Sequence, residues 1–219
     1  IKRKPINIHA QKEKKFPEKE LAEVKQAFLS IPTYEKKDRP VVGVVGEIYV
    51  RSNRFSNENL VKQLEELGAE VRLPPIGEWI YYTNFLAKRR NWERGNYGLY
   101  IRTKINDIFQ RRDEHKSLNI LDGDLRGGHE PTTEEILKLS RPYIHDSFEG
   151  EAVLSVGKAM DYIQKGVHGI VNAMPFTCMP GTVVNAVLKR VREENGNIPY
   201  LNMVYEGLED TNSKTRMEA

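Results

Sequence analysis

Short segments typical of strands alternate with segments of helical periodicity along most of the chain. The predicted strands lie at 41–46, 70–73, 168–174 and 199–204, and the first of them is a continuous apolar run. Runs of this length are typical of strands that are buried on both faces of a sheet. The segments with helical spacing are 60–67, 151–164 and 181–194. Because a strand, a helix and a second strand fit within about thirty residues, we expect parallel strands with right-handed crossovers.

These elements predict an α/β fold, namely a flavodoxin-like three-layer sandwich around a parallel four-stranded sheet in the order 2-1-3-4. The strand pattern pauses at about 77–147, which is predicted to be a helical insertion. The domain organisation expected from the whole pattern is a basic arm with a short helix at 1–39, followed by the α/β domain at 40–219.

The insertion has its own internal pattern. Its helical periodicity is predicted to break at Gly95 and Gly98, and one helical face carries Ile101, Ile105 and Ile108. Thr132 and Glu135 have the spacing of a capping box, so a further helix is expected to begin there.

Positive charge is concentrated at the start of the chain. Of the 219 residues, 30% are charged and 39% hydrophobic, and the formal net charge is +3. Residues 1–15 contain six Lys or Arg and one Glu, so the rest of the chain is nearly neutral. The segment 88–116 holds nine basic and four acidic residues, which we interpret as the solvated side of the insertion. No nucleic-acid partner is expected, because such proteins carry a basic face on the folded domain.

No apolar run approaches the roughly 20 residues of a membrane-spanning helix, and no N-terminal segment resembles a signal peptide. A single cysteine cannot form an internal disulfide, so a cytoplasmic protein without a membrane partner is expected. The chain opens on Ile1 and ends within a helix-forming phrase at 215–219. We therefore interpret it as a piece of a longer polypeptide.

Candidate chemistry is expected where the strand order reverses, between the first and third strands, because ligands bind there outside the carboxyl ends of parallel strands. One loop at this edge, 175–182, contains Cys178 directly before a helix. The N-terminus of a helix stabilises a thiolate, which would suit a metal ligand or a nucleophile. The alternative is that Cys178 is a small, buried hydrophobic residue.

The other loop at this edge runs from 47 to 56 and offers Glu47, Arg51 and Asn53 near the start of a helix. A carboxylate, a guanidinium and an amide there could hold a phosphate or carboxylate group. The alternative is an N-cap beside solvated arginines. Neither a dinucleotide-binding nor a P-loop fingerprint occurs, and the histidines show no metal-ligand spacing. The acids at 206–211 could receive a metal or an arginine, or could cap a final helix.

Three segments, 41–84, 149–182 and 205–219, together resemble the 2-hydroxyacyl-CoA dehydratase superfamily. The most specific phrases are EGEAVLSVGKA at 149–159 and MPFTCMPGT at 174–182. The resemblance is greatest to the C-terminal part of the large acyl-CoA dehydratase activase-related proteins. It implies that Cys178 is a ligand of an iron–sulfur cluster, with Thr177 beside it. It also implies that Glu47, Arg51 and Asn53 wall the same cleft.

The resemblance further implies that an ATP-driven activator delivers an electron for the dehydration or reduction of an acyl-CoA. One cysteine is fewer than the three or four thiolates that a cluster needs, so the other ligands are expected on remaining domains of the parent polypeptide. No cofactor is expected in the isolated chain. The alternative is a non-catalytic scaffold domain that docks partner subunits or domains. Exposed apolar surface around Cys178 would favour the cluster domain, and a closed polar cleft with Cys178 buried would favour the scaffold.

Overall fold

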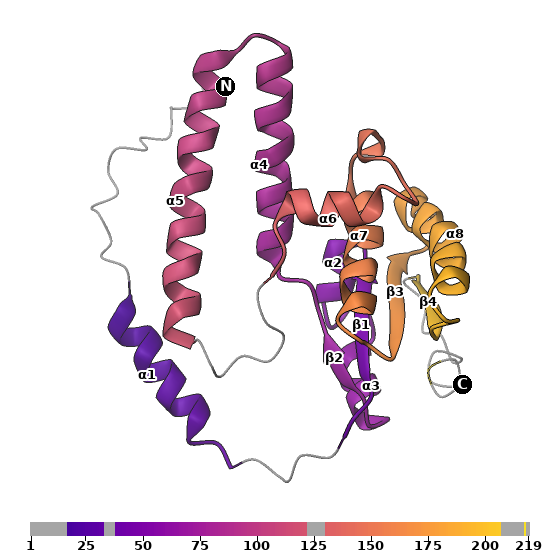
Figure 1. Ribbon diagram of the computed structural model, residues 1–219. Helices are drawn as coiled ribbons and strands as arrows, with labels where there is room; N and C mark the ends of the chain where they lie inside the picture. The colour runs from indigo at the N-terminus through magenta and orange to yellow at the C-terminus, as the bar shows by residue number, and fades with distance from the viewer. Residues whose placement is uncertain (1–16, 33–37, 122–129, 207–216, 218–219) are drawn as a thin grey trace, which may run out of the picture. The chain divides into compact units, whose positions relative to one another are not determined.

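Four parallel strands form one sheet in the order β2-β1-β3-β4, as expected from the sequence (Figure 1). The strands are β1 (Val41–Gly46), β2 (Glu70–Arg72), β3 (Gly169–Pro175) and β4 (Tyr200–Tyr205). In this computed structural model the described residues are 17–32, 38–121, 130–206 and 217. The register places Val44 opposite Val171, and Asn172 opposite Asn202. Because β1 lies between β2 and β3, the strand order reverses at β1 and β3.

Helices cover both faces of this sheet, which completes a three-layer, flavodoxin-like α/β sandwich. On one face lie α6 (Thr133–Ser140), α7 (Glu151–Gln164) and α8 (Met179–Glu194). On the other lie α2 (Ile48–Ser52) and α3 (Leu60–Glu66). Successive residues of β1 point to opposite faces, so Val45 packs with α7 and α8 while Val44 packs with α3. Both valines are fully buried.

The capping box predicted for α6 is confirmed. The Thr132 hydroxyl accepts the Glu135 backbone N–H at 3.3 Å, and the Glu135 carboxylate accepts the Thr132 backbone N–H at 2.7 Å. These two bonds satisfy donors that the first turn of a helix leaves without a partner. The predicted bounds of α7 are also confirmed, and the remaining predicted helices and strands of the sandwich agree within two residues.

Two local predictions were wrong. Gly98 does not interrupt a helix but lies inside α5 (Tyr97–Leu121), and the break after α4 (Ile76–Glu93) occurs at 94–96. Gly95 adopts a φ of +71°, which L-residues avoid, so this glycine alone has a conformational reason to end the helix. Arg51 also belongs to the short helix α2 rather than to a loop that runs from 47 to 56, because Glu47 caps that helix.

The chain divides into two compact units. One contains the described parts of 1–35 and 87–129, namely α1 (Glu18–Leu29), the end of α4, and α5. The other contains the described parts of 36–86 and 130–219, including the sheet and its covering helices. No described helix combines the length and apolar character needed to cross a membrane. The predicted basic arm at 1–16 lies outside the described residues.

Candidate functional site

The carboxyl ends of β1 and β3 lie side by side, and the two predicted loops leave the sheet there (Figure 1). The backbone N–H of Glu47, which follows β1, donates to the carbonyl of Ala173 in β3 at 2.9 Å. This edge carries all five residues predicted for a site. Glu47, Arg51 and Asn53 follow β1, and Thr177 and Cys178 follow β3.

Cys178 is the N-cap of α8 and is half-buried. Its Sγ accepts the backbone N–H of Gly181 at 3.3 Å. Gly181 permits this packing, because a Cβ at that position would meet the side chain of Met174 at 2.7 Å and the Cys178 sulfur at 3.3 Å. The sulfur therefore receives one of the N–H groups that the start of α8 leaves without a helical partner.

The loop that carries Cys178 is strained and exposes apolar side chains. Thr177 has a φ of +61°, an unusual conformation for a β-branched residue, and its hydroxyl donates to the Phe176 carbonyl at 2.6 Å. Phe176 is 60% exposed and Met179 is 63% exposed, although both are large and apolar. Backbone strain of this kind persists where the surrounding structure imposes it, and such sites are often functional.

Glu47 binds within its own segment, where its carboxylate accepts the Val50 backbone N–H at 2.6 Å and caps α2. A second carboxylate lies at the same place, since Glu151 Oε1 accepts the Ile48 N–H at 3.4 Å. Burial raises the pKa of Glu151, and the charge of Glu47 raises it further, while the Ile48 N–H and Arg51 oppose the increase. The start of α2 is therefore occupied by two carboxylates of this chain.

Arg51 points into the protein. Its side chain is 4% exposed, and Nη1 donates to the Gly46 carbonyl at 3.4 Å. Its Nη2 lies 3.7 Å from Oε1 of Glu78, which is 8% exposed and belongs to the first turn of α4. Burial raises the pKa of Glu78 to about 7, against the opposing effect of Arg51. The interior contact with Glu78 was not predicted from the sequence.

Helix α7 brings a further polar cluster to the carboxyl end of β1. Ser155 donates from Oγ to the Gly46 carbonyl at 3.4 Å, which is the same carbonyl that Arg51 reaches. Lys158 is fully buried, and its ammonium binds the carboxylate of Glu130 and lies 3.1 Å from Oδ2 of Asp161. Its Nζ also stands over the ring of Tyr162, 5.1 Å from the centroid. Burial raises the pKa of the Tyr162 hydroxyl, so this group remains protonated.

Sequence reasoning missed this cluster, although the sequence carries a signal for it. Polar residues recur at 151, 155, 158 and 162, a spacing that places them on one side of a helix whose other positions are largely apolar. Among the described residues, Arg51 Nε, Glu78 Oε1 and the Tyr162 hydroxyl are buried without a hydrogen-bond partner. Buried polar atoms in such positions are commonly satisfied by ordered water.

Asn53 stabilises the turn after α2. Its Oδ1 accepts the backbone N–H groups of Phe55 and Ser56, each at 3.0 Å, and its Nδ2 donates to the Tyr49 hydroxyl at 3.0 Å. Within the described residues, no hydrogen bond or ion pair joins Cys178 to Glu47, Arg51 or Asn53. The structure therefore brings the predicted residues to one edge without linking the two loops directly.

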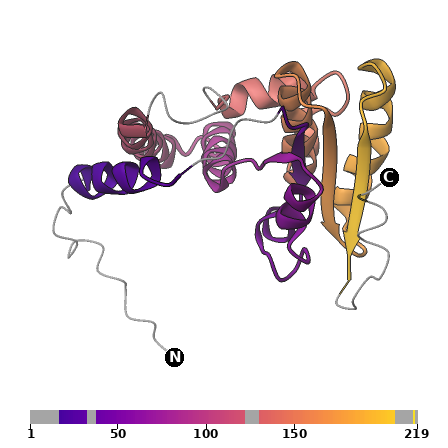
Figure 2. The same cartoon turned by 90° about the horizontal axis from the view of Figure 1, so that it is seen from below.

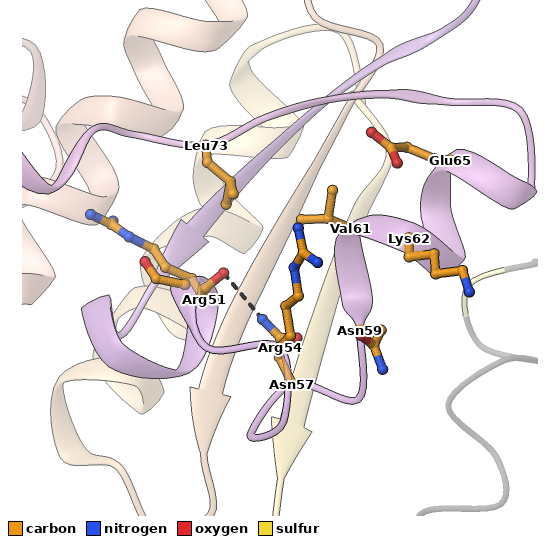
Figure 3. A pocket seen from close by; sticks show the side chains of 9 residues that line it. Arg51, Arg54, Asn57, Asn59, Val61, Lys62, Glu65 and Leu73 are labelled. Atoms are coloured by element: carbon orange, nitrogen blue, oxygen red, sulfur yellow. Dashed lines mark hydrogen bonds between the residues drawn. The ribbon is translucent and has the colours of Figure 1, made fainter.

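An open pocket of about 450 Å³ lies beside this loop, between α2 and α3 (Figure 3). Arg54 and Lys62 add two exposed cations to its lining, and Glu65 adds one carboxylate. Asn57 holds the wall in place, since its Nδ2 donates to the carbonyls of Val50 at 2.8 Å and Arg51 at 3.1 Å. Figure 3 shows the Arg51 guanidinium directed away from Arg54, so this part of Arg51 does not join the other two cations.

Metal-ligand side chains do not gather at this edge within the described part of the chain. In residues 17–32, 38–121, 130–206 and 217, no group of three or more His, Cys, Asp or Glu could hold a metal ion. Cys178 offers a single thiol at this edge, since the residue is half-buried and its sulfur accepts the Gly181 N–H. Of the acids after β4, Glu206 is exposed, and 207–211 lie outside the described residues.

The sandwich and its polar edge define a protein with a flavodoxin-like α/β domain and a candidate site at the reversal of strand order. Comparison with known proteins identifies no family for the chain, since no family model, curated protein or solved structure matches it.

Proposed function

We propose that this chain is one domain of an iron–sulfur protein related to the 2-hydroxyacyl-CoA dehydratases and their activases, and that Cys178 supplies one ligand to its cluster. The supporting observation is the surroundings of Cys178. Cys178 is half-buried, and the neighbouring Phe176 and Met179 are 60% and 63% exposed. Exposed apolar side chains around a polar site are typical of surfaces that another domain or subunit covers.

The chain would contribute three things to such a site. Cys178 would provide a thiolate, and the start of α8 would stabilise its negative charge. The Gly181 N–H would donate to the ligating sulfur, an interaction that adjusts the reduction potential of iron–sulfur centres. Phe176 and Met179 would pack against the covering domain and exclude water. The cluster, when bound, supplies a low-potential electron for the dehydration or reduction of a CoA thioester.

The partners in this proposal are the remaining domains of the parent polypeptide, an ATP-dependent activase module and an acyl-CoA. The other cluster ligands would come from outside this chain, because its single cysteine provides one thiolate. The isolated chain should therefore fold without metal and lose iron after anaerobic reconstitution.

The decisive experiment compares the full-length parent polypeptide with its Cys178→Ser variant after anaerobic purification. Iron and acid-labile sulfide should fall in the Cys178→Ser protein, because serine is a poor replacement for a thiolate ligand. Thr177→Ser is the matched control, since it retains the hydroxyl that bonds to Phe176 and should retain the iron. Unchanged iron in Cys178→Ser, or a stable iron–sulfur chromophore in the isolated chain, would contradict the proposal and favour a scaffold domain.

A further inference from the structure

Helix α5 turns a polar side toward the end of α4. Lys88 of α4 lies 2.8 Å from Oδ2 of Asp107, and Arg111 lies 3.4 Å from the same oxygen. Asp107 is 5% exposed, which makes it the most deeply buried side chain described in α5. A charged residue therefore occupies the position that an apolar residue usually takes in a helical hairpin. The hairpin is joined here by an ion pair.

Three isoleucines of α5 lie on a different side and are exposed. Ile101 is 54% exposed, Ile105 47% and Ile108 57%, and Phe109 beside them is 52% exposed. Helix α1 contacts α5 near its other end, where Lys25 donates to the Ile120 carbonyl at 3.0 Å (Figures 1 and 2). We call the surface formed by Ile101, Ile105, Ile108, Phe109 and Arg112 the α5 stripe.

The spacing within the α5 stripe matches a helix–helix seam. Positions 101, 105, 108 and 112 follow one another at intervals of four, three and four, as the core positions of a heptad do. The flanking positions of the same heptads are 102, 104, 109 and 111; Arg102 and Lys104 lie on opposite sides of the seam, while Arg111 pairs with Asp107. Arg112 adds a further cation within the seam, stacked over the Phe109 ring at 5.4 Å.

We propose that the α5 stripe is a docking surface for an amphipathic helix of a partner protein, with apolar residues in its seam and Asp or Glu at its flanks. Such a helix would cover the isoleucines and bring carboxylates to the cations on both sides of the seam. A second copy of this chain is a poorer occupant, because its stripe would bring like charges together. An anionic membrane is also a poorer occupant, because interfacial helices need a broad apolar face, whereas this stripe is narrow and contains Arg112.

This inference does not depend on the proposed cluster, and its test uses the full chain with two synthetic helical peptides. Both peptides are about four heptads long with Leu in the seam, and they differ only in carrying Glu or Lys at the flanking positions. The Glu peptide should bind at least about tenfold more tightly than the Lys peptide, and added salt should reduce the difference. Equal binding of both peptides, or binding of neither, would overturn the proposal.

Two variants locate the binding surface. Ile105→Ser should weaken binding of the Glu peptide by about tenfold or more, with unchanged helix content in far-ultraviolet circular dichroism. Leu99→Ser is the matched control, because Leu99 is 52% exposed on the same helix but lies off the stripe, and binding should be unchanged. The double variant Arg102→Glu and Lys104→Glu should reverse the preference, so that the Lys peptide binds better. Retained preference for the Glu peptide in that variant would overturn the proposal.

The same proteins discriminate the other occupants. Sedimentation measures whether the chain dimerises, and vesicles that contain phosphatidylserine measure whether it binds a membrane. We expect neither dimerisation nor vesicle binding that depends on Ile105. Dimerisation that Ile105→Ser abolishes would overturn the proposal in favour of a second copy of the chain, and vesicle binding that Ile105→Ser abolishes would overturn it in favour of a membrane surface.

Discussion

The guanidinium of Arg51 and the carboxylate of Glu78 meet inside the protein, although the residues belong to α2 and α4. The two charged groups are 3.7 Å apart, and their side chains are 4% and 8% exposed. Burial raises the pKa of Glu78 to about 7, so its ionisation falls within the pH range of ordinary experiments. The pair links the loop after β1 to the first turn of α4.

Glu78 should make the stability of the protein depend on pH. Between pH 4.5 and about 7 the unfolded chain loses the Glu78 proton while the folded chain retains it. The folded state then binds more protons, so the free energy of unfolding should fall as pH rises through this range, by up to about 3 kcal/mol. Urea denaturation of the protein and of Glu78→Gln measures this contribution. The variant should gain stability relative to the protein as pH rises, and a pH-independent difference would contradict the prediction.

Removing Arg51 should leave an uncompensated buried carboxylate. We expect Arg51→Met to lower the free energy of unfolding by roughly 3–5 kcal/mol at about pH 8, where Glu78 is ionised. The loss should be smaller near pH 5, where Glu78 is protonated. Lys62→Met is the control, since Lys62 and Glu66 are also 3.7 Å apart but are 73% and 64% exposed. An exposed pair of this kind contributes at most about 0.5 kcal/mol. Equal losses in the two variants would show that burial does not strengthen the Arg51 contact.

Two lysines that pair with one carboxylate should differ in their contributions to stability. Lys158 and Lys165 lie 3.1 Å and 3.0 Å from Asp161, but their side chains are 0% and 29% exposed. Lys158→Met should cost about 3 kcal/mol, because it removes a fully buried ammonium from Asp161, which is 8% exposed, and from Glu130. Lys165→Met should cost about 1 kcal/mol or less. Thermal and urea unfolding of the two variants measure the difference, and a larger loss for Lys165→Met would contradict it.

Gly46 should tolerate no side chain. It has a φ of +113°, and a Cβ there would meet the Ala173 carbonyl oxygen at 2.1 Å. Gly46→Ala should therefore destabilise the protein by more than about 3 kcal/mol, because β1 and β3 would have to separate. Gly68 has a similar φ of +98° with no atom within 4 Å of a Cβ, so Gly68→Ala should cost only about 1 kcal/mol of strain. Similar losses in both variants would show that the backbone conformation, and not the contact, determines the cost.

The strands and most helices of the sandwich could be predicted from local patterns. Runs such as 41–46 are apolar on both sides, and this pattern is typical of strands that helices cover on both faces of a parallel sheet. The capping pair Thr132 and Glu135 marks the start of α6 through bonds that lie within one helical turn. Gly98 was misinterpreted because a single glycine can remain inside a helix at a modest cost, and only the φ of Gly95 distinguishes the true break.

The position of the candidate site could also be predicted, because the order of strands and helices determines which carboxyl ends are neighbours. The direction of each side chain at that edge could not. Arg51 is charged and follows a strand, and the same local sequence is compatible with a solvated arginine. Its inward direction depends on Glu78, which lies 27 positions further along the chain and approaches only when α4 is in place.

The sequence by itself determined most of the secondary structure, the parallel sheet and the edge at which Cys178 lies, because each follows from the residues of one segment or from the order of segments. Only the tertiary structure decided that α7 is buried on several sides, with Lys158 inside between Glu130 and Asp161. Only the tertiary structure, too, decided that α5 turns Asp107 toward Lys88 and leaves Ile101, Ile105 and Ile108 exposed. The physical reason is that a charge can be buried only where a distant segment brings an opposite charge to it. A local sequence pattern does not specify such a contact between distant segments.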